Sequence, residues 1–168
     1  ADVCTLRAGD SVQLELNQMR RMDHSQQHSA QHLLSATILR LCGAPTRSFH
    51  LGERYSVIDV DTPSLPMADA LTVEDEVLRV IRENWPMVTH LCPPEDVTSF
   101  PLRRAPPQGE EILRIVEIDG LDFTPCCGTH VASTGALGLF RILRTEKYKG
   151  MSRVYFVAGQ RAYADYRR

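Results

Sequence analysis

Two histidines stand four residues apart in the segment His28-Ser-Ala-Gln-His32. On a helix this spacing places both imidazoles on one face with neighbouring Cβ atoms, so that the pair can chelate one ion. Taken alone, such a pair is more often ordinary surface than a metal site. Ser29 occupies the position at which a zinc protease helix carries its general base, which argues against that class of peptidase.

A second ligand pair lies far along the chain, in the segment Cys-Cys-Gly-Thr-His that begins at Cys126 and ends at His130. Together with His28 and His32, these two residues make a tetrahedral set of three histidines and one cysteine, which suits zinc. The combination is far more specific than either pair. The sequence therefore predicts one Zn²⁺ site.

Alternative ligands remain open at this point. Cys127 can replace its neighbour as the sulfur ligand, and His24 can form a helical pair with the first of the two histidines. We favour the later pair because His32 runs directly into an apolar stripe, which would fix the orientation of its ring. Asp23 or Asp122 can accept a hydrogen bond from a ligating imidazole.

The histidine pair requires a helix, and the cysteine segment requires a loop held against it. We expect the helix to begin at the N-cap Ser25 and to stop at Gly43, and the loop to span residues 121–136. A second helix is expected from Thr72 to Pro86, and a long surface loop over 93–111. The remaining expected elements are strands at 48–51, 55–60, 87–91, 112–118, 139–145 and 153–158 and a helix over 160–168.

These elements alternate without a glycine-rich phosphate loop. They predict an α+β fold with a mixed or antiparallel sheet, packed helices and one zinc site between a helix and a loop. Residues 9–16 alternate polar and apolar side chains and are expected to form a further strand.

Composition limits the classes of protein that are possible. The 168 residues are 43% hydrophobic, enough for the core of one domain or of a domain and a fragment of another. The longest apolar runs are too short to cross a bilayer, and no signal peptide is visible, so no membrane partner is expected. The cysteine count of 5 is odd, which indicates a reducing compartment. We expect a cytoplasmic protein.

Charge is divided unevenly along the chain. Residues 141–168 hold eight Arg or Lys and two acidic residues, a net charge of +6, whereas the remaining residues hold 11 basic and 19 acidic residues, a net charge of −8. A protein that is near neutral in total can still present a basic face to phosphate. A solvated surface explains the same pattern equally well.

The ligand segments resemble those of a known family. His28-Ser-Ala-Gln-His32-Leu-Leu is similar to the His-x-x-x-His helix of alanyl-tRNA synthetase editing domains, and Cys126-Cys-Gly-Thr-His130-Val, followed by Thr134-Gly135, to their Cys-Gly-Gly-Thr-His-Val loop. The flanking segments 20–27 and 46–52 resemble the free-standing AlaX deacylases more closely. In this register Cys127 replaces a glycine, so the resemblance implies Cys126 as the ligand.

The resemblance spans about residues 9–160 and extends to the closing strand at 153–159. Threonyl-tRNA synthetase editing domains share the zinc ligands but carry Asp where this chain has Thr124, which favours the alanyl branch. The resemblance implies residues 18–168 as the zinc-containing editing domain. It implies residues 1–17 as a linker or the last strand of a truncated N-terminal β-barrel, and hence an excised domain.

The activity implied is hydrolysis of the ester that joins a wrong amino acid, chiefly serine, to alanine-specific tRNA, with tRNA rather than DNA as partner. Serine differs from alanine by one hydroxyl, which a polar site can recognise. Zinc can activate water, orient the aminoacyl group or hold helix to loop; we favour orientation. The alternative function is a catalytically inactive, zinc-stabilised tRNA-binding or adaptor module.

Three polar residues on one expected strand are the candidate catalytic residues. The family places a polar residue near the amino-acid side chain where this chain has Ser48, and Thr46 is expected on the same face of the strand. His50, also expected on that face, is a candidate for proton transfer. The tRNA phosphates are expected to meet basic residues of two segments: Arg144, Lys147 and Lys149, with Arg103 and Arg104.

Overall fold

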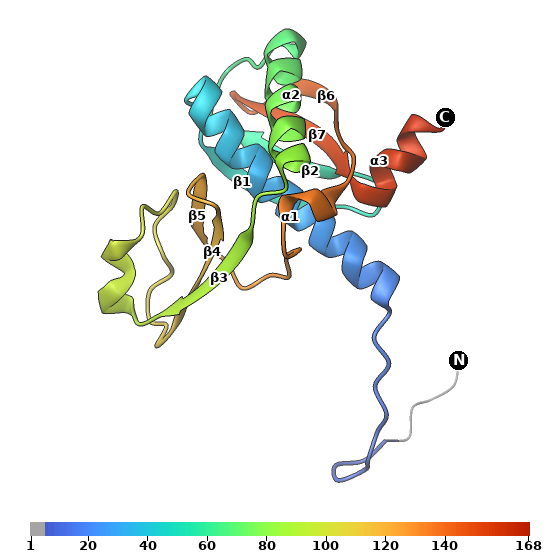
Figure 1. The fold of residues 1–168 in the computed structure, drawn as a ribbon, viewed down its shortest axis with the longest axis vertical. Helices are drawn as coiled ribbons and strands as arrows, with labels where there is room; N and C mark the ends of the chain where they lie inside the picture. The colour runs from blue at the N-terminus through green and yellow to red at the C-terminus, as the bar shows by residue number, and fades with distance from the viewer. Residues whose placement is uncertain (1–5) are drawn as a thin grey trace.

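The computed structural model describes residues 6–168, and within them the chain forms an α+β fold with two separate sheets (Figure 1). One sheet has four strands in the order β1-β2-β7-β6, and the other has three in the order β3-β4-β5. Every strand pairing is antiparallel. The predicted combination of antiparallel sheets and packed helices is confirmed.

The central helix α1, Gln18–Cys42, carries the histidine pair. It begins earlier than the sequence pattern predicts, because the side chain of Asn17 accepts a hydrogen bond from the backbone N–H of Arg20 at 3.0 Å and caps the helix. The expected N-cap Ser25 is instead a buried helical residue. The predicted stop is confirmed, since Gly43 has φ 64° and closes the helix with its N–H.

The four-stranded sheet is built from β1, Thr46–Leu51, β2, Ser56–Val60, β6, Phe140–Tyr148, and β7, Met151–Ala158. Helices α1 and α2, Met67–Glu83, pack together against it. The second helix begins after Pro66 rather than at Thr72, and Asn84 in the left-handed region ends it before Pro86. The main core lies between these layers, and its largest buried side chains include Leu33, Leu34, Ile38, Ile58, Phe140 and Phe156.

The three-stranded sheet is built from β3, Met87–Cys92, β4, Leu113–Ile118, and β5, Asp122–Pro125. The long segment expected as a loop contains the short helix η1, Pro94–Ser99, and helps to cover a second small core around Ile115. Strand β5 corrects the prediction that 121–136 is loop throughout. The chain reverses at Asp119 and Gly120, both with positive φ, and so returns alongside β4.

The last elements follow the predicted order. The short helix η2, Thr134–Leu137, leads into β6. Lys149 and Gly150 have positive φ at the turn between β6 and β7, and α3, Gly159–Tyr166, ends the fold. No described helix is long and apolar enough to cross a membrane.

Residues 9–16 do not form the predicted strand. They are exposed and irregular, and in Figure 1 this segment runs away from the body of the molecule. An alternating segment becomes a strand only when another strand takes up its backbone hydrogen bonds, and within residues 6–168 none pairs with it. The expected first segment, 1–17, lies partly outside the described residues.

Candidate metal centre and adjoining pocket

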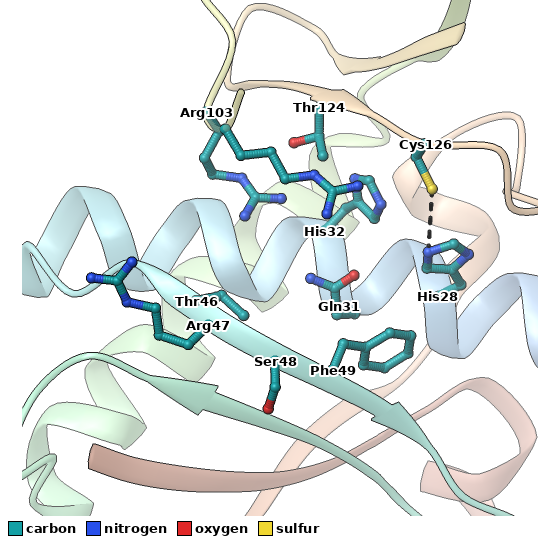
Figure 2. Close-up of a pocket in the computed structure, with 11 residues that line it drawn as sticks. His28, Gln31, His32, Thr46, Arg47, Ser48, Phe49, Arg103, Thr124 and Cys126 are labelled. Carbon is teal, nitrogen blue, oxygen red and sulfur yellow. Dashed lines mark hydrogen bonds between the residues drawn. The ribbon is translucent and has the colours of Figure 1, made fainter. Parts of the chain in front are cut away.

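The structure brings together the four residues predicted as metal ligands. The ligand atoms of His28, His32, Cys126 and His130 all lie within 4.8 Å of one another. Cys126 Sγ lies 3.5 Å from His28 Nε2, as the dashed line in Figure 2 shows. A tetrahedral zinc ion with bonds of about 2.0–2.3 Å needs its ligand atoms about 3.3–3.8 Å apart, which this cluster approaches.

The protonation states of the cluster suit a cation. Burial raises the pKa of the Cys126 thiol, but the three neighbouring histidines and the Gly128 N–H stabilise the thiolate more and lower its pKa to about 3. Burial, the largest influence, lowers the pKa of His130 and favours its neutral, ligating form. His130 Nε2 is buried and has no hydrogen-bond partner among the described residues. A thiolate beside an unpartnered imidazole nitrogen is a donor set that a metal ion would complete.

Two polar residues lie beside the Nδ1 atoms of two of the histidine rings. Ser29 Oγ lies 3.2 Å from His130 Nδ1, which leaves Nε2 facing the cluster. Asp122 Oδ2 lies 3.5 Å from His32 Nδ1, near enough for an electrostatic contact, although this nitrogen has no hydrogen-bond partner among the described residues. Burial raises the pKa of Asp122, but His32 and Arg103 lower it more, so its carboxyl is ionised. Of the two expected acceptors, Asp122 is the one that lies beside a candidate ligand ring.

Asp23, the other expected acceptor, lies elsewhere. It forms an ion pair with Arg161, whose Nη2 lies 2.6 Å from Asp23 Oδ2. This pair links the N-terminal part of α1 to α3.

The loop that carries the sulfur ligand approaches α1 very closely. A Cβ added at Gly128 would lie 2.1 Å from Cε1 of His28, so only glycine fits there without displacing that ring. Arg114 Nη1 holds the same loop from outside by donating to the carbonyl of Cys126 at 2.6 Å and to that of Gly128 at 2.9 Å. The glycine within the Cys-Cys-Gly-Thr-His segment is therefore required by packing.

The alternative ligands do not join the cluster. Cys127 is exposed and borders a different cavity, together with Arg104 and Arg114. His24 is outside the group of ligand atoms that converge. The geometry thus agrees with the choice of Cys126 and of the later histidine pair.

A polar pocket of about 210 Å³ adjoins the cluster between α1, β1 and β5 (Figure 2). It is lined by His28, Gln31, His32, Thr46, Arg47, Ser48, Phe49, Arg103, Arg104, Thr124 and Cys126. Phe49 stacks on His28 with ring centroids 5.6 Å apart. A small polar group can therefore be held beside the candidate metal ligands.

The prediction that Thr46, Ser48 and His50 share one face of a strand is wrong. The register of β1 against β2 shifts between Thr46 and Ser48, which is a bulge, and a bulge turns the following side chains to the other face. Thr46 Oγ1 faces α1 and donates to Ser35 Oγ at 2.7 Å. The hydroxyl of Ser48 instead donates to Asp59 at 2.6 Å, although the residue still borders the pocket.

His50 lies on the same outer face of β1 as Ser48. It borders a separate cavity with Tyr55, Arg153 and Tyr155, away from the metal cluster. The geometry offers it no proton transfer at the pocket.

The basic residues expected to meet tRNA lie in two places. Arg103 and Arg104 border the pocket, whereas Arg144, Lys147 and Lys149 belong to β6 and its turn, at the opposite edge of the four-stranded sheet from β1. Three strand spacings of about 4.8 Å separate these edges by about 14 Å.

Two of these arginines are already paired with carboxylates. Arg103 is largely buried and donates to Asp122 at 2.6 Å, so it holds the carboxylate that lies beside the candidate metal ligand His32. Arg144 is paired with Glu146 and lies over the ring of Tyr155 at 3.6 Å. Arg104 is exposed, and its guanidinium donates to the carbonyl of Pro125 at the pocket rim.

Sequence reasoning missed Gln31, Arg47 and Phe49. Gln31 could have been found, because it stands three residues after His28 and so shares its helix face. Phe49 and Arg47 depend on the bulge in β1, which no sequence pattern marks.

The fold and the site define an α+β domain in which a buried helix and a loop share a candidate metal centre. Residues 113–155, which include Cys126 and His130, match the family described as threonyl and alanyl tRNA synthetase second additional domain. The resemblance that the motifs predict is confirmed by this match and by the relatives.

The chain is 38% identical over 159 residues to the alanyl-tRNA editing protein Aarsd1 of Mus musculus, covering 93% of this chain and 39% of that protein. It is 34% identical over 160 residues to the alanyl-tRNA editing protein AlaX-L of Pyrococcus horikoshii, with the same 93% and 39% coverage. It is 32% identical over 170 residues to the alanine–tRNA ligase of Methanothrix thermoacetophila, covering 94% of this chain and 18% of that protein. The chain thus spans about two fifths of the length of the two editing proteins.

Proposed function

We propose that this domain hydrolyses the ester of mischarged aminoacyl-tRNA, with serine on alanine-specific tRNA as its substrate. The observation that carries the proposal is a His₃Cys cluster that opens onto a small polar pocket. The relatives named as alanyl-tRNA editing proteins supply the substrate class. Residues 18–168 would form the editing domain, acting in the cytoplasm.

The cluster is proposed to hold one zinc ion through His28, His32, Cys126 and His130. The support is the convergence of the ligand atoms, the low pKa of the thiol and the unpartnered Nε2 of His130. When bound, zinc supplies a Lewis acid that can orient and polarise the aminoacyl group. Four protein ligands fill its tetrahedral shell, which favours orientation over activation of water.

The residues of the pocket are proposed to hold the amino acid and exclude bulk water. Thr46 directs its hydroxyl toward α1 within the pocket wall and is the better candidate for contact with the amino-acid side chain. Ser48 and His50 lose support as catalytic residues because their polar groups lie on the other face of the sheet. Arg104 at the rim is the pocket residue best placed to meet a tRNA phosphate.

A deacylation assay tests the function. The protein loaded with zinc should release serine from seryl-tRNA(Ala) and leave alanyl-tRNA(Ala) largely intact. If zinc and tRNA both bind but neither ester is hydrolysed, the domain is the zinc-stabilised tRNA-binding module instead.

A further inference from the structure

Gln31 is a buried polar residue in the wall of the proposed active-site pocket. It is not one of the four candidate metal ligands. It lies on α1, one position before the metal ligand His32, and its side chain borders the pocket. Figure 2 shows its carboxamide reaching from α1 into the space toward β1. Only 7% of the residue is exposed.

A short chain of hydrogen bonds fixes the Gln31 carboxamide. Its Nε2 donates to Ser35 Oγ at 2.8 Å, and Thr46 Oγ1 donates to the same oxygen at 2.7 Å. Ser35 is fully buried, so neither bond competes with bulk water. With its nitrogen held in this way, the carboxamide oxygen of Gln31 is the free end, and it accepts no hydrogen bond from a described residue.

We propose that Gln31 is a specificity residue whose Oε1 accepts a hydrogen bond from the side-chain hydroxyl of the seryl group. This assignment rests on the proposed deacylase function. A seryl group satisfies the carboxamide oxygen, whereas the methyl of an alanyl group displaces water from it and leaves it unpaired. The site thereby penalises alanine as well as attracting serine.

The seryl group offers Gln31 two possible hydrogen-bond donors, its side-chain hydroxyl and its ammonium group. The charge of the pocket favours the hydroxyl. The wall contains Arg47, Arg103 and Arg104, and no carboxylate borders it. The cationic ammonium group of the amino acid would be repelled by these arginines, whereas a hydroxyl carries no net charge and meets no Coulombic penalty there.

The substitution Gln31→Met tests the assignment, because methionine has a similar length and cannot accept a comparable hydrogen bond. Hydrolysis is measured on seryl- and alanyl-tRNA(Ala), and binding on the non-hydrolysable 3′-seryl-amide and 3′-alanyl-amide of adenosine. We expect kcat/KM for seryl-tRNA to fall about tenfold, with alanyl-tRNA unchanged or faster. The matched control is Gln160→Met, at an exposed position of α3, which should leave both values unchanged.

Zinc content and thermal unfolding separate recognition from a structural role. Gln31→Met should keep its zinc and lose preference for the seryl amide over the alanyl amide. An unchanged serine-to-alanine ratio overturns the assignment, and so does an equal loss on both substrates accompanied by loss of zinc. If the unmodified protein hydrolyses neither ester, the proposed function fails, and the two amides still decide whether Gln31 recognises the hydroxyl.

Discussion

Ser29 Oγ lies 3.2 Å from His130 Nδ1, and this contact joins the histidine helix to the cysteine loop behind the metal cluster. The same hydroxyl oxygen accepts the backbone N–H of Val131 at 3.0 Å. When His130 Nε2 serves as a ligand, Nδ1 carries the proton and donates to Ser29. Ser29, which stands where a zinc protease helix carries its general base, thus contacts the ring of a candidate ligand.

Replacing Ser29 by Ala should weaken zinc binding by about 10–100-fold without removing a ligand, because the His130 ring loses its orienting contact. Competition with a chromophoric chelator measures the affinity. Ser64→Ala is the control, because Ser64 is exposed and borders a cavity that contains none of the candidate ligands. Equal affinity in the two variants would show that the loop backbone alone orients His130.

Replacing each of the two adjacent cysteines by alanine should have opposite effects on zinc content. Cys126→Ala removes the thiolate from the cluster and should reduce the zinc content from about one ion per chain to almost none. Cys127→Ala should retain the metal, because this side chain is exposed and lies outside the group of converging ligand atoms. Elemental analysis of the two purified variants measures the difference, and the reverse result would identify the other sulfur as the ligand.

Gly128→Ala should lower both zinc affinity and thermal stability. The backbone of Gly128 is outside the left-handed region, so the effect comes from the contact of the added Cβ with His28. A double-mutant cycle isolates it: in a His28→Ala background the same substitution should destabilise far less. If the two substitutions change the free energy of unfolding additively, the added Cβ does not act through contact with His28.

Thr46→Ala and Ser48→Ala should have different effects on the serine-over-alanine preference, because the two hydroxyls lie on opposite faces of β1. Loss of the Thr46 hydroxyl removes one end of the hydrogen-bonded chain through Ser35 and should narrow the serine-over-alanine preference by about tenfold. Ser48→Ala should leave the preference unchanged, because its hydroxyl faces Asp59. Rates on both aminoacyl-tRNAs measure this, and a larger effect at Ser48 would contradict the observed register.

Charge reversal of Lys147 and Lys149 should weaken binding of every tRNA by a similar factor and leave the amino-acid preference intact. If both lysines contact phosphates, the slope of log affinity against log salt should become shallower by about 1.4–1.8, at about 0.7–0.9 per contact. Filter binding across a salt series measures the slope. Arg104→Glu provides the comparison at the pocket rim, and unchanged affinity after the lysine reversal would place the tRNA on another face.

Much of the candidate site follows from local sequence. The spacing of His28 and His32 fixes their shared helix face once a helix forms, and Gly43 fixes where that helix ends. The ligand motif Cys126 to His130 is short enough that its backbone keeps both side chains close together. Such relationships span only a few residues, and the sequence therefore determines the two candidate ligand pairs and the helix end.

Other features were decided only by tertiary structure. The bulge in β1 separates Thr46 from Ser48, because register is set by pairing with β2 rather than by the alternation of side chains. Arg103 became a buried partner of Asp122 because β5 formed where a loop was expected, bringing them together. Residues 9–16 remained irregular because no described strand pairs with them. Each outcome depends on a contact between distant parts of the chain, which local pattern does not encode.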